Sequence, residues 1–341
     1  MNDGSAENGL FVDQLPGGPG VSTIDPSDPA AAYFGLLSRL RSPLTLRELM
    51  ISSVRTGYIG QGELDPQLLP PAAADLYPDI QVETLAVPSP LGKIRCQLYT
   101  PPGGKSGRPV LLYLHGGGFT VGSSEDTAYI TSRIAAENDI VVVSVNYRLA
   151  PEWPFPSGLD DALTVLEWLR AHAGSIGGDA SRIYAGGDSA GGNLAAALPH
   201  RARDSGAAQP EGVVVLCPIT DFNVEQYASF ERLAPLGIIY DTAFVGYIRG
   251  AYVVRHALWS HPHVSPALGD LSTYPPTLVV SGGVDPVIDD NRAFAAKLEV
   301  AGRDVTLAVS SGMPHGFYFF PHLLPEGEEA FAAIGRFFKS R

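Results

Sequence analysis

Gly187-Asp188-Ser189-Ala190-Gly191 is the stretch of this sequence that decides the fold. An apolar, strand-like run at 183–185 precedes it, and a run with helical spacing at 193–198 follows it. Glycines on both sides of a serine allow a sharp turn from strand to helix that holds the hydroxyl clear of the backbone. The helix N-terminus also stabilises negative charge nearby. A glycine-rich turn without chemistry would not need this setting, so the stretch predicts a nucleophile at Ser189.

A second glycine-rich stretch, His115-Gly116-Gly117-Gly118-Phe119, directly follows a strand-like run at 110–114. Consecutive glycines let backbone amides converge on one point, where side chains would otherwise obstruct them. Such amides stabilise the negative oxygen that develops when a serine attacks a carbonyl group, and losing one donor typically costs about 3 kcal/mol of barrier. We expect the oxyanion hole to consist of the amides of Gly116, Gly117 and Ala190.

Glycine-rich loops also cradle nucleotides, but this sequence disfavours both common forms. A dinucleotide fingerprint that begins at Gly116 would need glycine where Val121 stands, and the stretch 186–193 lacks the ending of a P-loop. The formal net charge of −13 repels phosphate backbones, and no cluster of lysine and arginine reverses it locally. We therefore expect no nucleic acid partner, and neither nucleotide motif is supported.

A serine hydroxyl is a poor nucleophile at neutral pH, so Ser189 needs a base and the base needs a third group to fix its tautomer. In a fold with this kind of turn, the carboxylate and then the histidine follow the serine, each on a loop after a later strand. Asp285 follows the strand-like run at 277–281, and His315 follows the one at 305–309. The predicted catalytic residues are therefore Ser189, Asp285 and His315.

The remaining histidines and carboxylates compete less well for these roles. His115 precedes the serine and is expected to brace the oxyanion loop, as are Tyr147 and Asp188 around the turn. A solvated or capping role is expected for the histidines on or near helix ends, which are His172, His200 and His322. A metal site is disfavoured at the cluster of His256, His261 and His263, because no acidic or cysteine ligand lies nearby at a recognised spacing. A charge role at a helix N-terminus is expected for Asp289 and Asp290.

The rest of the chain predicts a sheet whose strands alternate with helices. Apolar runs recur at 82–87, 94–99, 110–114, 140–145, 183–185, 213–217, 277–281 and 305–309. Helical patterns separate several of them, and another closes the chain at 328–339. This alternation predicts an α/β fold with a mostly parallel central sheet flanked by helices.

One interval breaks this rhythm, because 60 positions separate Cys217 from Thr277, far more than a single crossover needs. Its aromatic and aliphatic side chains are numerous enough to cover an apolar cleft. We predict a flexible tail at 1–27, an N-terminal cap segment at 28–75 and a catalytic domain at 76–341. Within that domain, residues 222–262 are expected to contribute to a helical cap.

Composition indicates the compartment. Cys96 and Cys217 each lie in a strand-like run, where a buried free thiol is typical, and this favours a reducing environment. Residues 1–27 lack the basic and apolar regions of a secretory signal. The longest apolar runs fall far short of the roughly 20 residues that span a bilayer. We expect a cytoplasmic protein without stable membrane insertion.

Several motifs, taken together, resemble the bacterial hormone-sensitive-lipase family (family IV) of esterases, in its GDSAG subgroup. They are HGGGF at 115–119, NYRLAPE at 146–152, WPFP at 153–156, GDSAGGNLA at 187–195, VDP at 284–286 and HGF at 315–317. The resemblance covers residues 80–341. It implies the α/β-hydrolase fold with a helical cap and a serine carboxylesterase that hydrolyses small-molecule esters of short to medium acyl chains through an acyl-enzyme. It also implies that no cofactor is needed and that a homodimer is frequent.

Two prolines depart from the expected pattern. Pro199 falls within the helix after the nucleophile, where it removes a backbone N–H and crowds the carbonyl of Ala195, so we expect that helix to kink or end early. Pro314 directly precedes His315, stiffens its loop and biases Met313 toward extended geometry. Neither proline takes the place of a catalytic group.

Two other functions stay open at this stage. Amide, lactone or carbamate hydrolysis would use the same triad and differ in how the leaving group is protonated and housed. A small-molecule receptor without turnover is the second alternative, since plant gibberellin receptors resemble this family but have lost the base histidine. The presence of Ser189, Asp285 and His315 disfavours the receptor.

Overall fold

The computed structural model describes residues 72–236, 240–320, 324 and 326–341. The predicted tail at 1–27 lies outside the described residues, as does the predicted N-terminal cap segment apart from its last four positions. Ala72 caps a short helix, α3 (Ala73–Leu76), that contains the other three positions and precedes the sheet.

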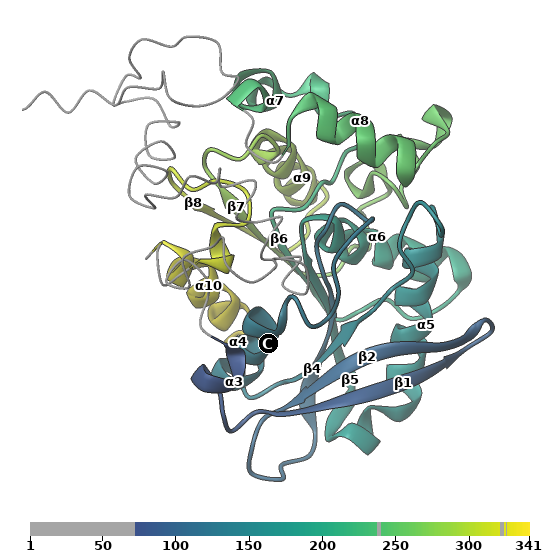
Figure 1. The fold of residues 1–341 in the computed structure, drawn as a ribbon, viewed down its shortest axis with the longest axis vertical. Helices are drawn as coiled ribbons and strands as arrows, with labels where there is room; N and C mark the ends of the chain where they lie inside the picture. The colour runs from purple at the N-terminus through teal and green to yellow at the C-terminus, as the bar shows by residue number, and fades with distance from the viewer. Residues whose placement is uncertain (1–71, 237–239, 321–323, 325) are drawn as a thin grey trace, which may run out of the picture.

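The described chain is built on one eight-stranded sheet (Figure 1). In space the strands follow the order β1-β2-β4-β3-β5-β6-β7-β8. Strand β2 pairs antiparallel with β1 and β4, and all the other pairs are parallel. The strands are β1 (Gln81–Ser89), β2 (Gly92–Thr100), β3 (Arg108–Leu114), β4 (Val141–Val145), β5 (Gly178–Asp188), β6 (Val213–Leu216), β7 (Thr277–Gly282) and β8 (Val305–Ser310). The predicted α/β-hydrolase architecture, a mostly parallel central sheet flanked by helices, is confirmed.

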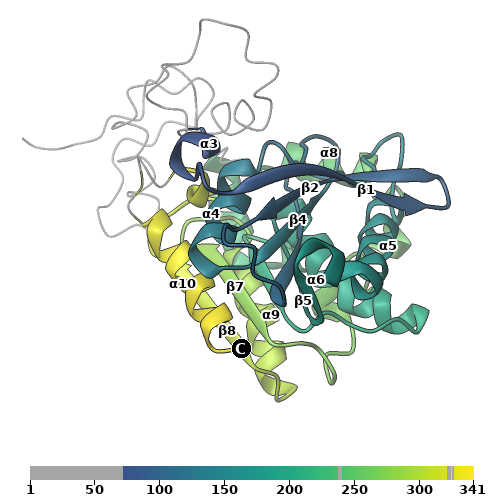
Figure 2. The same ribbon diagram turned by 90° about the horizontal axis from the view of Figure 1, so that it is seen from below.

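Helices cover both faces of the sheet (Figure 2). The helices are α4 (Ala128–Asn138), α5 (Ser157–His172), α6 (Ser189–Ser205), α7 (Ala228–Leu233), α8 (Thr242–Ala251), α9 (Ile288–Val300) and α10 (Gly327–Lys339). Alternate residues of β3 point to opposite faces: Leu112 packs in one core with residues of α5, α6 and α9, and Leu111 packs in another with residues of α4 and α10. Central strands are therefore apolar on both sides, and every residue of β4 is buried.

The helix after the turn at Ser189 runs without interruption past Pro199, as far as Ser205. The expectation of an early end was therefore wrong. Pro199 is itself buried, together with the residues on either side of it. Packing along the buried length of α6 outweighs the single backbone hydrogen bond that proline removes.

The long interval between β6 and β7 carries the short helix α7 and the helix α8 (Figure 1). Asp241 begins α8 by accepting a hydrogen bond from the Phe244 amide at 2.7 Å, a cap that sets where the helix begins. Buried side chains from this interval join the core formed with α5, α6 and α9, among them Phe230, Tyr240 and Ile248. In the part of the chain that the structure describes, no helix is both long and apolar enough to cross a membrane.

Candidate active site

Ser189 lies where β5 gives way to α6, in a strained backbone conformation. Its φ is +53°, in the left-handed region that residues with a side chain seldom adopt. The glycines on either side of Ser189 allow the turn to pack closely against the end of β3. A Cβ atom on Gly191 would lie 2.0 Å from the carbonyl oxygen of Leu114, and one on Gly187 would lie 2.5 Å from the same oxygen. The predicted sharp turn between strand and helix is confirmed, with the serine at its tip.

The loops after β7 and β8 bring the predicted carboxylate and base to this serine. His315 Nε2 lies 3.0 Å from Ser189 Oγ, and His315 Nδ1 lies 2.7 Å from Asp285 Oδ2. Both Asp285 and His315 are buried. A carboxylate only accepts, so Nδ1 carries the proton and Nε2 is free to accept from the serine hydroxyl. Asp285 and His315 follow Ser189 by 96 and 126 positions in the sequence. In the fold, the three residues form one continuous hydrogen-bonded chain.

Cys217 lies against the same carboxylate. Burial raises the pKa of its thiol well above the ordinary value, and the charge of Asp285 adds to this effect. Ligand atoms of Cys217, Asp285 and His315 lie within 4.8 Å of one another, the one such group of metal-ligand type among the described residues. The 2.7 Å contact between His315 and Asp285 is the length of a hydrogen bond, which accounts for the cluster without a metal.

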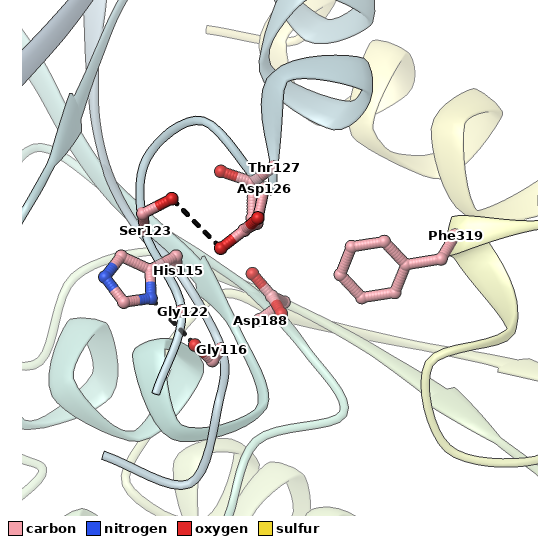
Figure 3. Close-up of a pocket in the computed structure, with 8 residues that line it drawn as sticks. All are labelled: His115, Gly116, Gly122, Ser123, Asp126, Thr127, Asp188 and Phe319. Atoms are coloured by element: carbon pink, nitrogen blue, oxygen red, sulfur yellow. Dashed lines mark hydrogen bonds between the residues drawn. The ribbon is translucent and has the colours of Figure 1, made fainter. Parts of the chain in front are cut away.

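The oxyanion loop lies beside a buried carboxylate, that of Asp188 (Figure 3). The Tyr113 hydroxyl donates to this carboxylate at 2.9 Å. Burial raises the pKa of Asp188 to about 6, and hydrogen bonds from Tyr113 and the backbone of Gly116 moderate the rise. A Cβ atom on Gly116 would lie 2.3 Å from Asp188 Oδ2. Glycine at this position therefore lets the carboxylate approach the loop backbone.

The other two predicted donors are placed differently. Gly117 has a φ of +117°, and a Cβ there would lie 2.1 Å from the carbonyl oxygen of Val121, so the turn of the loop requires glycine. Ala190 is the second residue of α6. Amides in the first turn of a helix have no acceptor within the helix, so that of Ala190 is available to a ligand.

His115 and Tyr147 brace this loop from behind. The Tyr147 hydroxyl donates to the His115 carbonyl oxygen at 2.7 Å, and the two rings stack with centroids 4.3 Å apart. Burial lowers the pKa of His115 to about 4, so its ring is neutral at pH 7. Its Nδ1 lies 2.7 Å from the carbonyl oxygen of Gly116 and donates to it. These contacts agree with the bracing role expected for both residues.

Comparison with known proteins decides the family. A family model described as alpha/beta hydrolase fold matches residues 111–319, a span that contains the serine, the carboxylate and the histidine. This chain belongs to the alpha/beta hydrolase family. The predicted place among esterases of the hormone-sensitive-lipase type is confirmed, whereas the GDSAG subgroup stays a prediction.

Relatives of this hydrolase carry esterase names. Carboxylesterase NlhH of Mycobacterium tuberculosis is 33% identical over 261 residues, which cover 75% of this chain and 81% of that protein. Ethyl acetate hydrolase of Pseudomonas putida is 34% identical over 242 residues, or 70% of this chain and 76% of that one. Among solved structures, an esterase of Pyrobaculum calidifontis superposes with a TM-score of 0.73 at 34% identity, over 76% of this chain and 85% of that chain.

Sequence reasoning missed one side chain of the hydrolase at this site. The hydroxyl oxygen of Tyr240 lies 3.2 Å from Ser189 Oγ, and its ring meets the His315 ring edge to face with centroids 4.6 Å apart. Tyr240 comes from the long interval between β6 and β7. The aromatic richness of that interval predicts a cover over the cleft, but no spacing or motif singles out this tyrosine.

The rival histidines lie elsewhere. His200 was expected near a helix end, but it lies inside α6 and is buried, with Nε2 3.1 Å from the Pro266 carbonyl oxygen. His172 is the last residue of α5, as expected, and His322 lies outside the described residues. His263 pairs with Asp204 at 2.8 Å. Asp289 and Asp290 lie in the first turn of α9, as predicted.

Proposed function

We propose that Ser189, His315 and Asp285 carry out the reaction of this chain, which is a carboxylic ester hydrolase, through an acyl-enzyme. The relatives named above support the reaction class. One observation carries the assignment of residues: an unbroken line of hydrogen bonds runs from the serine hydroxyl through the imidazole to a buried carboxylate. This arrangement supplies nucleophile, base and orienting group together.

In the first half of the reaction, Ser189 Oγ attacks the ester carbonyl carbon while His315 Nε2 takes its proton. The imidazolium that forms is stabilised by the buried Asp285 carboxylate. The tetrahedral intermediate then collapses, the bond to the alcohol oxygen breaks, and the alcohol leaves with the proton from His315. Water attacks the resulting acyl-enzyme by the same route in reverse, and the carboxylic acid is released.

The negative oxygen of the intermediate needs backbone donors close to Ser189. Of the three amides predicted for this role, those of Gly117 and Ala190 have the stronger support. Gly116 already hydrogen-bonds to the Asp188 carboxylate, which competes with a role at the oxyanion. A helix N-terminus at Ala190 favours the developing charge further.

Short to medium acyl chains are the proposed substrates. One relative is named for ethyl acetate and another, from Streptomyces hygroscopicus, is named acetyl-hydrolase. The Tyr240 hydroxyl contacts Ser189 Oγ, and the ring of Phe244 packs on that of Tyr240 with centroids 5.4 Å apart. We propose that residues 222–262 form part of a cap that limits the length of the acyl group.

Chromogenic esters of increasing acyl length test this function. We expect the best turnover at about two to eight carbons, the range that the family resemblance implies, and loss of most activity in Ser189→Ala. Matched aryl ester and anilide substrates separate an esterase from an amidase, and equal rates on both would count against the esterase. A long-chain optimum with interfacial activation would indicate a true lipase instead.

Two further parts of the proposal concern the protein's surroundings. Both cysteines are free and buried, which fits a cytoplasmic protein. A homodimer is proposed from the family resemblance, and light scattering coupled to size exclusion distinguishes it from a monomer.

A further inference from the structure

We propose that Tyr240 is a catalytic residue whose hydroxyl donates a hydrogen bond to Ser189 Oγ and stabilises that oxygen when it leaves the acyl group during deacylation. The proposal rests on the proposed role of Ser189 as nucleophile. It starts from the 3.2 Å contact between the two oxygens and from the burial of Tyr240, which is 0% exposed.

The direction of this hydrogen bond follows from counting protons. The single proton of the serine hydroxyl is committed to His315 Nε2, 3.0 Å away, because Nδ1 of that ring donates to Asp285. Tyr240 must therefore supply the proton in its contact with Oγ. Burial raises the pKa of Tyr240 above the ordinary value of 10, so the phenol keeps its proton throughout the working range of pH.

The position of the Tyr240 ring is fixed from several sides. Its ring packs edge to face on His315 and on Phe244, with centroid distances of 4.6 and 5.4 Å. The next residue, Asp241, caps α8 through the Phe244 amide. The hydroxyl is thus held at Oγ by an anchored helix and two ring contacts, and its placement needs no reorganisation as charge develops.

The two halves of the reaction use this donor unequally. Before acylation, Oγ is a hydroxyl oxygen that already accepts from Tyr240, so attack gains little from the contact. In the acyl-enzyme, Oγ is an ester oxygen and a weak acceptor. When the second tetrahedral intermediate collapses, the C–Oγ bond breaks, its electron pair stays on Oγ, and His315 returns a proton to that oxygen. Tyr240 keeps its own proton and strengthens its hydrogen bond as the negative charge appears on Oγ. The contact therefore lowers the barrier of deacylation more than that of acylation.

Tyr240→Phe tests the role, because it removes the hydroxyl and keeps the ring contacts. With p-nitrophenyl acetate we expect kcat to fall about tenfold, KM to fall with it, and kcat/KM to change less than about twofold. A burst of p-nitrophenol close to one per enzyme should appear, and the mass of acid-quenched enzyme should show accumulated acetyl-enzyme. A merely structural role would lower kcat/KM and leave no acyl-enzyme.

Tyr252→Phe is the matched control. Tyr252 is a second buried tyrosine of the same interval, and its hydroxyl has no hydrogen-bond partner among the described residues. Its loss should leave kcat, KM and burst unchanged. The proposal is overturned if Tyr240→Phe equals wild type, or if kcat/KM falls without a burst while a phosphonate probe still labels Ser189. Absence of labelling in the wild type would instead remove the nucleophile assignment, and this proposal with it.

Discussion

The Nδ1 atom of His315 lies 2.7 Å from Oδ2 of Asp285, and the carboxylate is wholly buried in the loop after β7. A second oxygen of the same carboxylate accepts from the amide of Val287 at 3.1 Å, so the group is held in one orientation. Asp285→Asn keeps this shape but replaces the acceptor that fixes the tautomer of His315. We expect kcat to fall by about three to four orders of magnitude with little change in melting temperature.

Asp289→Asn is the control for this experiment. Asp289 follows closely in the sequence but lies on α9, where it accepts from the Ser229 amide and pairs with Arg292. Loss of the Asp289 charge should leave kcat within about twofold of the wild-type value, since Asp289 has no contact with the base His315. The assignment fails if Asp285→Asn keeps more than a tenth of the activity, and it passes to Asp289 if that variant is the inactive one.

Gly191→Ala addresses the turn that carries the nucleophile. The added Cβ would lie 2.0 Å from the Leu114 carbonyl oxygen and 2.4 Å from that of His115. Both atoms belong to the backbone of β3 and its loop, so neither can move without disturbing the sheet. We expect loss of activity together with a loss of at least about 3 kcal/mol of unfolding free energy, measured by urea denaturation.

Gly174→Ala provides the comparison for that substitution. A Cβ at Gly174 meets nothing within 4 Å, so this variant should match wild type in activity and in unfolding free energy. If Gly191→Ala were as stable and active as Gly174→Ala, the close approach of α6 to β3 would not be a requirement of the turn.

Much of this site could be predicted from the sequence, because its parts have local signatures. Ser189 stands between glycines that only a strand-to-helix turn explains, and Asp285 and His315 follow apolar runs that became β7 and β8. Chain order then limits the choice of acid and base, because parallel strands end at one edge of the sheet. The predicted strands and the two-sided helical cover follow from the same periodicity.

What the sequence could not supply depends on contacts between distant segments. Tyr240, just before α8, reaches Ser189 from a segment distant in sequence, and no local pattern records that packing. His200 was expected on or near a helix end, whereas burial of α6 carries the helix past Pro199 and His200. Gly116 resembles its neighbouring glycines in sequence, but its place beside Asp188 is a matter of tertiary geometry.

The two cysteines should be unreactive in the folded protein. Burial raises the pKa of the Cys96 thiol to about 12 and that of Cys217 well above its ordinary value. Thiolate, not thiol, attacks disulfide reagents, so we expect no reaction with Ellman's reagent in native buffer and two equivalents in denaturant. Fast reaction of native protein, lost in Cys217→Ser, would mean that the carboxylate side of the site opens to solvent.

The buried carboxylate of Asp188 should make stability depend on pH. Its pKa is raised by burial from 3.8 to about 6, so between these values the folded protein keeps a proton that the unfolded chain releases. The resulting stabilisation is complete below pH 4 and is lost as the pH rises through 6, a span worth about 3 kcal/mol. Asp188→Asn cannot titrate, and its unfolding free energy relative to wild type should therefore increase by about 2 kcal/mol from pH 4 to pH 6.5, the part of that span that falls within this range. Urea denaturation of both proteins across this range measures the difference. Other titrating groups, such as Asp290 with its raised pKa of about 7, contribute equally to both proteins and cancel in the difference. A constant difference would show that Asp188 is ionised throughout, with hydrogen bonds from Tyr113 and Gly116 sufficient to hold the charge.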